Sequence, residues 1–155
     1  IIHTMDDTIA TARKISRDLM PTVLEKMGLL EAIESLCTDI QSSTGMDISF
    51  TQRTNEKVDL DKQSEINLYR IIKELINNAI KHARADKIIV EVNTVNGQLC
   101  LVVRDNGVGF AIDHVKKTGF GLRSIENRAY LIKASVTYES DETTGTKVTL
   151  LTNVL

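Results

Sequence analysis

The stretch LYRIIKELINNAIKHARADKI, residues 68–88, decides how this chain folds. Apolar residues recur in it at intervals of three and four, the spacing that places them on one face of an α-helix. The pattern predicts a long helix over about residues 61–83. Its expected buried stripe comprises Leu68, Ile71, Ile72, Leu75, Ile76, Ala79 and Ala83.

The segments around this helix predict a sheet that the helix can cover. Asn96-Gly97 joins two strand-like stretches, and both residues tolerate the positive φ of a tight hairpin. In chain order, the expected elements are helices over about 1–20 and 29–43, a strand over 46–52, the long helix, strands over 87–95 and 98–105, a helix over 122–132, and strands over 135–140 and 147–153. Pro21 is expected to end or kink the first helix. This order predicts an α+β fold, a two-layer sandwich of a mixed, mostly antiparallel sheet with helices on one face.

The composition excludes several classes of function. Nineteen basic and 21 acidic residues give a net charge of −2, so no overall positive field attracts nucleic acid. No run of about 18 apolar residues is present, so we expect no membrane contact from this chain. Two cysteines, Cys37 and Cys100, make no disulfide framework, which favours the cytoplasm. The chain begins with Ile1 and has no signal-peptide pattern, so we expect a fragment of a longer protein.

Polar residues on the long helix suggest a first chemical site. At 100° per residue, Glu74, Asn78 and Lys81 fall within one sector, together with Arg70. A neutral amide oxygen suits a hard cation, an ammonium group neutralises phosphate, and a carboxylate can orient or deprotonate a nucleophile. The alternative is a solvated helix face with a ladder of polar side chains.

A second candidate site follows the strand over 98–105. Asp105 is in phase with the apolar residues of that strand, so it is expected to point into the core, where a carboxylate needs a donor. Gly107 and Gly109 follow and would allow close approach of a ligand such as adenine with its exocyclic amine. The alternative is a turn that ends the strand.

Two further glycine motifs complete the pattern. Gly119-Phe120-Gly121-Leu122 precedes a helix, where free N–H groups can hold phosphate, although a flexible connection is the simpler interpretation. Thr144-Gly145-Thr146 is typical of a hairpin turn, from which the Thr146 hydroxyl could face the same pocket.

Together, these motifs resemble the ATP-binding domain of the GHKL superfamily, which includes the histidine kinases and gyrase. Longer stretches of the sequence narrow the resemblance to sensor histidine kinases of two-component systems. Residues 68–88 resemble their N box, and RDNGVGF (104–110) and GFGLRSIENRAYLIKA (119–134) resemble their two glycine boxes. ISRDLMPTVLEKMGLLEAIESL (15–36) resembles the second dimerisation helix and junction of the nitrate-sensor-like subfamily. The resemblance implies a C-terminal catalytic fragment, with the end of a dimerisation helix over 1–22 and the ATP-binding domain over 23–155.

The resemblance also implies a role for each matching residue. Asn78 would coordinate the Mg²⁺ that bridges the ATP phosphates, and Glu74 would be the catalytic acid/base or water-orienting residue. Asp105 would accept a hydrogen bond from the adenine amino group, and residues 110–120 would form a lid over ATP. The remaining implied nucleotide contacts are Asn77, Lys81, His82, Gly107, Val108, Gly109, Gly119, Phe120, Gly121, Leu122 and Thr146.

The implied reaction transfers the γ-phosphoryl group of Mg·ATP to a histidine and then to an aspartate of a response regulator. His3 is followed by Thr4, not by the acidic residue typical of the acceptor, so we expect the acceptor to lie outside this chain. The parent would be a homodimer through its dimerisation helices, with this domain in the cytoplasm and membrane anchoring of the parent left open. The alternatives are a GHKL module that binds nucleotide without catalysis and a serine kinase of the anti-sigma-factor type.

Overall fold

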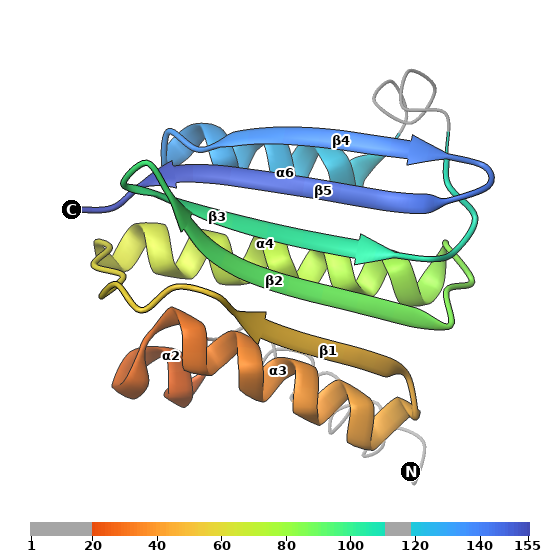
Figure 1. Ribbon diagram of the computed structural model, residues 1–155, viewed down its shortest axis with the longest axis horizontal. Helices are drawn as coiled ribbons and strands as arrows, with labels where there is room; N and C mark the ends of the chain where they lie inside the picture. Colours follow the sequence, from red (N-terminus) through yellow and green to blue (C-terminus); the bar gives the residue numbers. More distant parts are fainter. Residues whose placement is uncertain (1–19, 111–118) are drawn as a thin grey trace, which may run out of the picture.

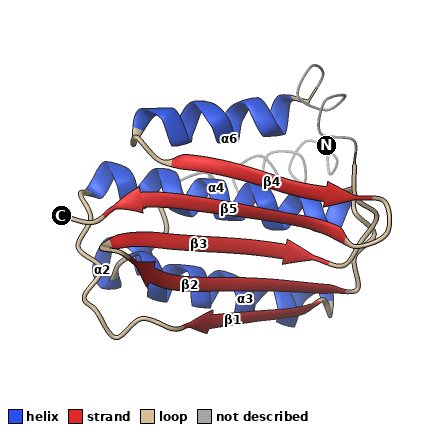
Figure 2. Ribbon diagram, turned by 45° about the horizontal axis from the view of Figure 1, so that its top comes forward, coloured by secondary structure: helices blue, strands red, loops and turns tan. Residues whose placement is uncertain are grey.

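The computed structural model describes residues 20–110 and 119–155. It is a two-layer α+β structure with helices on one face of a five-stranded sheet (Figures 1 and 2). The strands are β1 (Asp47–Gln52), β2 (Lys87–Val95), β3 (Gln98–Asp105), β4 (Ser135–Asp141) and β5 (Gly145–Asn153). The helices are α2 (Thr22–Met27), α3 (Leu29–Thr44), α4 (Lys62–Lys81) and α6 (Phe120–Leu131). The predicted fold class is confirmed.

The sheet is mixed, with strand order β1-β2-β3-β5-β4. Only β1 and β2 run parallel, and the other three pairings are antiparallel. Asn96 (φ 52°) and Gly97 (φ 75°) close the predicted hairpin between β2 and β3. The register of β3 and β5 places Asp105 opposite Thr146, which brings two predicted site residues to the same end of the sheet.

Helix α4 forms the centre of the helical layer. Its start is fixed by Asp61, whose carboxylate accepts hydrogen bonds from the backbone N–H of Ser64 at 2.9 Å and from the Ser64 hydroxyl at 2.7 Å. Every residue of the predicted stripe is buried, and Leu68, Ile71, Ile72 and Ile76 have no exposed surface. The stripe shares one hydrophobic core with buried residues of β2, β3 and β5, so the 3.6-residue period correctly identified the core face.

The structure differs from the predicted elements near the beginning of the chain. Helix α2 follows Pro21 directly, whereas the sequence predicted no element between Pro21 and residue 29. Proline fixes φ and lacks an N–H, so it suits the start of a helix as well as its end. The expected helix over 1–20 and most of the expected lid, residues 111–118, lie outside the described residues.

Candidate functional site

One cavity of about 500 Å³ gathers most of the predicted site residues. It lies where α4 and β3 end and α6 and β5 begin, at the right-hand end of the molecule in Figure 1. Its volume falls within the range of small-molecule sites. The lining includes the predicted residues Glu74, Asn78, His82, Asp105, Val108, Gly109, Gly119, Phe120, Gly121, Leu122 and Thr146.

Helix α4 contributes Glu74 and Asn78 to this cavity, and His82 caps its C-terminus. At 100° per residue, Asn78 and His82 lie about 40° and 80° from Glu74 on one side of the helix, whereas Lys81 and Asn77 lie about 20° and 60° on the other. Lys81 and Asn77 accordingly do not line the cavity, and Asn77 lines a different groove. The polar sector predicted from the sequence is therefore divided, with Glu74 at the boundary.

Asp105 provides a buried carboxylate at the end of β3, as its phase in the strand predicts. It is 7% exposed, and its Oδ1 accepts a hydrogen bond from the backbone N–H of Gly107 at 2.9 Å. Burial raises the pKa of the Asp105 carboxyl, and the backbone N–H groups of Gly107 and Thr146 only partly oppose this shift. Further hydrogen-bond donors would stabilise the charged form, so the site favours a ligand that presents an N–H group.

The glycines after Asp105 allow the backbone to approach its neighbours closely. A Cβ on Gly107 would lie 2.1 Å from the carbonyl oxygen of Ala83, and one on Gly109 would lie 1.9 Å from that of Asp141. Gly107 itself does not line the cavity, and its role in the fold is to bring the 105–110 segment against the end of α4. Val108 and Gly109 then form part of the cavity wall.

The start of α6 meets Glu74 and Asn78 directly. A Cβ on Gly121 would lie 3.0 Å from Glu74 Oε1 and 3.4 Å from Asn78 Nδ2. Gly119 is the N-cap and provides no side-chain cap. The start of α6 therefore borders the part of the cavity that contains this carboxylate and amide, and the N-terminus of a helix favours anions. Phe120, at 89% exposed, borders the opening.

Sequence reasoning missed the polar partner of Thr146. The Ser140 hydroxyl lies 3.0 Å from the Thr146 hydroxyl and accepts a hydrogen bond from the backbone N–H of Phe110 at 2.9 Å. Ser140 thereby connects β4, β5 and the residue that precedes 111–118. No local motif identifies it, because the contact depends on the pairing of β4 with β5.

The apolar walls of the cavity were also not assigned as site residues. Leu75 and Ala79 come from α4, Ala83 follows the end of α4, and Val103 and Val148 come from the sheet. The sequence identified Leu75, Ala79 and Ala83 as core, and a buried stripe gives no sign of where it borders a cavity. Among the residues that the structure describes, no group of three or more His, Cys, Asp and Glu side chains could hold a metal ion by itself.

Comparisons with known proteins agree with this geometry. Residues 63–154 match the family described as histidine kinase-, DNA gyrase B-, and HSP90-like ATPase. The chain is 31% identical to sensor histidine kinase MctS of Rhizobium johnstonii over 97% of its own length and 33% of that protein. It is 32% identical to oxygen sensor histidine kinase NreB of Staphylococcus carnosus, over 94% of its own length and 42% of that protein.

A solved structure shows the same fold. The ATP-binding domain of PrrB from Mycobacterium tuberculosis superposes with a TM-score of 0.65 at 16% identity, covering 81% of this chain and 93% of that one. The chain thus spans about a third to two fifths of the curated relatives named above. Within 20–110 and 119–155, no helix combines the length and apolar character needed to cross a membrane.

Proposed function

Because the chain belongs to the histidine kinase-, DNA gyrase B-, and HSP90-like ATPase family, we propose that it is the catalytic domain of a sensor histidine kinase. In this proposal, it binds Mg·ATP and transfers the γ-phosphoryl group to a histidine outside the chain. A response-regulator aspartate is then the next acceptor. Residues 23–155 would form the ATP-binding domain and residues 1–22 the end of a dimerisation helix of a homodimer.

The observation that carries the proposal is the distribution of polar groups in the 500 Å³ cavity. The buried carboxylate of Asp105 lies at the end of β3, and Glu74 and Asn78 lie beside the start of α6. Apolar side chains, among them Ala79 and Val148, lie in the walls. A nucleotide has the matching order of groups: a flat base with an amino group, then a chain of phosphates.

At the base end, we propose that Asp105 accepts a hydrogen bond from the adenine amino group. Thr146 lies opposite Asp105 in the sheet and would add a hydroxyl near the base. The desolvated carboxylate would gain a donor in addition to the backbone N–H groups of Gly107 and Thr146, which makes binding selective for a base with an amino group at this position.

At the phosphate end, the residues present fit a Mg²⁺ ion that is held jointly with the phosphates. Asn78 offers an amide oxygen and Glu74 a carboxylate, and Mg²⁺ in phosphate sites characteristically uses one or two protein oxygens plus phosphate oxygens. Asn78 would hold the ion, which when bound supplies positive charge that neutralises the phosphates. Glu74 would orient or deprotonate the nucleophile, and His82 faces the cavity as a further phosphate contact.

Two other functions use the same cavity. A GHKL module without catalysis would bind nucleotide but transfer nothing, and a serine kinase of the anti-sigma-factor type would phosphorylate a hydroxyl. Similarity to sensor histidine kinases over more than nine tenths of the chain, including the helices before β1, favours the histidine kinase. The presence of both Glu74 and Asn78 in the cavity favours catalysis over binding alone.

The first test is ATP affinity, measured by calorimetry with and without Mg²⁺. We expect Asp105→Ala to weaken binding about 10- to 100-fold, since a hydrogen bond to a charged group contributes roughly 1.5–3 kcal/mol. Asn78→Ala should remove the Mg²⁺ dependence. Asp86→Ala is the matched control, because Asp86 is exposed and does not line the cavity. Absence of ATP binding by the wild-type chain at millimolar ATP would contradict the proposal.

The second test is transfer. The chain is mixed with radiolabelled ATP and a segment of its parent that carries a histidine followed by Asp or Glu. Acid-labile, base-stable labelling of that segment, lost in Glu74→Gln, supports a histidine kinase. Acid-stable labelling would identify a hydroxyl kinase, and ATP binding without labelling would favour the binding module.

A further inference from the structure

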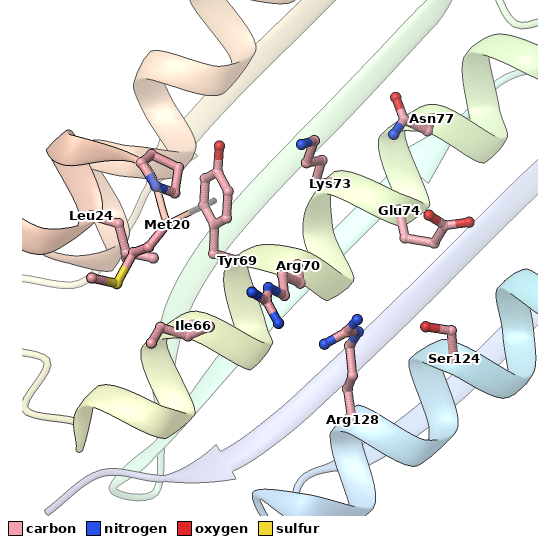
Figure 3. Close-up of a pocket in the computed structure, with 11 residues that line it drawn as sticks. Met20, Leu24, Ile66, Tyr69, Arg70, Lys73, Glu74, Asn77, Ser124 and Arg128 are labelled. Atoms are coloured by element: carbon pink, nitrogen blue, oxygen red, sulfur yellow. The ribbon is translucent and has the colours of Figure 1, made fainter. Parts of the chain in front are cut away.

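A second cavity lies on the other side of Glu74, in a groove between α2, α4 and α6 (Figure 3). Its volume is about 400 Å³. One half is apolar, with Met20, Leu24 and Ile66, and the other half carries Arg70, Lys73 and Arg128. Glu74 lines both this groove and the proposed nucleotide cavity. The two cavities therefore lie on either side of Glu74 along helix α4.

This half of the groove carries three basic side chains and one acidic side chain, Glu74. Arg70 from α4 and Arg128 from α6 point toward one another across the groove (Figure 3). In the described part of the chain, no carboxylate lies within ion-pair distance of either guanidinium group. Two like charges directed into one half-enclosed space repel each other, and an anion between them would remove the repulsion.

A buried amide holds one side of the Arg128 guanidinium group in place. Its Nη1 donates a hydrogen bond at 3.4 Å to Oδ1 of Asn67, a buried amide that is 2% exposed. The Asn67 amide is itself fixed, since its Nδ2 donates to the carbonyl of Gln63 at 2.9 Å. A guanidinium group has five N–H donors in a planar fork, so Arg128 retains donors that can bind a carboxylate in the groove.

We propose that this groove docks an acidic segment of a partner protein, with a carboxylate held between Arg70 and Arg128. The apolar half would receive a neighbouring apolar side chain of the same segment, against Met20, Leu24 and Ile66. This second half favours a protein segment over a free inorganic anion, because a free anion would leave the apolar wall unused. Electrostatic complementarity of this kind selects partners and accelerates their association.

The position of Glu74 gives the docking a consequence for the nucleotide cavity. A segment in the groove would contact α4 at Glu74, and Glu74 and Asn78 also line the proposed nucleotide cavity. Docking would therefore place the partner next to the residues proposed to hold the phosphates. This consequence rests on the proposed function. The docking itself does not, and it can be tested without ATP.

The test compares how tightly the chain binds two fluorescein-labelled helical peptides. One peptide carries Glu and Leu at i, i+4 spacing, and the other has Gln in place of every Glu. We expect the acidic peptide to bind more tightly by about tenfold or more, with an affinity that falls as salt rises. Nuclear magnetic resonance of the ¹⁵N-labelled chain should show shifts of the Arg70 and Arg128 Nε–Hε signals.

Charge-reversal variants locate the site. Arg70→Glu should abolish the preference for the acidic peptide and favour a peptide with Lys in place of Glu. Arg104→Glu is the matched control, because Arg104 is exposed on β3 and lines neither cavity. Retained ATP binding by Arg70→Glu would show that the nucleotide site is intact, which separates failure of this proposal from failure of the proposed function.

Four outcomes of the peptide experiments would overturn the proposal. The first two are absence of binding of the acidic peptide at millimolar concentration and equal binding of the acidic and Gln peptides. The third is an unchanged preference for the acidic peptide in Arg70→Glu. The fourth is full displacement of the peptide by millimolar inorganic phosphate, which would assign the groove to a free anion. Self-association of the wild-type chain in sedimentation, lost in Arg70→Glu, would assign the groove to a second copy and also overturn it.

Discussion

Replacing Gly107 with alanine should destabilise the fold by steric contact alone. The new Cβ would lie 2.1 Å from the Ala83 carbonyl oxygen and 2.7 Å from the Ala83 carbonyl carbon, whereas real Cβ contacts stay beyond 3.0 Å. The two segments must therefore separate by about 1 Å. That shift would break the hydrogen bond from the Val108 N–H to the same oxygen, now 2.7 Å. Overpacking of about 1–3 kcal/mol plus the lost bond of about 1 kcal/mol predicts a loss of about 3 kcal/mol.

Urea denaturation of Gly107→Ala and Gly97→Ala separates this cause from backbone strain. Gly97 has a φ of +75° and open space around its Cβ position, so alanine there should cost only about 1 kcal/mol of conformational strain. ATP affinity of Gly107→Ala should also fall, because Val108 and Gly109 in the cavity wall move with the segment. A smaller loss of stability in Gly107→Ala than in Gly97→Ala would refute the reasoning.

Three further predictions concern residues around the site. Asn106→Ala should cost about 1–2 kcal/mol in urea denaturation, and Asn106→Asp less, since Oδ1 of Asn106 accepts hydrogen bonds from the Asp86 and Lys87 N–H groups at 3.0 and 2.9 Å. Burial raises the pKa of Asp105 in the folded protein, so the unfolded state releases its proton at lower pH. The free energy of unfolding of wild type should therefore fall, relative to Asp105→Asn, as pH rises from about 4 through the raised pKa. A constant difference between the two proteins across that range would contradict this. Lys62→Met should speed amide exchange in α2, because the Lys62 ammonium group donates to the Leu24 carbonyl at 3.1 Å; unchanged exchange would show that α2 is held by packing alone.

The sequence predicted those features that depend on local periodicity. The stripe from Leu68 to Ala83 placed α4 and its core face correctly, because burial of one helix face repeats every 3.6 residues. Asn96-Gly97 identified the hairpin, because few other residue pairs tolerate its positive φ angles. The inward direction of Asp105 followed from the two-residue period of β3.

Features that depend on contacts between distant segments could not be predicted in the same way. The sequence placed Glu74, Asn78 and Lys81 in one polar sector, and only the packing of α6 shows that a boundary runs through that sector. Ser140 entered the site through the register of β4 and β5. Likewise, Gly107 suggested close approach to a ligand, whereas the structure places the Ala83 backbone at that position.

The position of α6 relative to α4 links the two cavities physically. At its start, Gly121 lies against Glu74 and Asn78 in the cavity proposed to bind nucleotide, and two turns later Arg128 reaches Asn67 beside the groove. The proposed phosphate contacts at the start of α6 and the proposed docking contact at Arg128 would therefore lie on the same helix. If both ligands favour the same shifted position of α6, their binding free energies would be coupled, and by reciprocity each would raise the affinity for the other by the same factor.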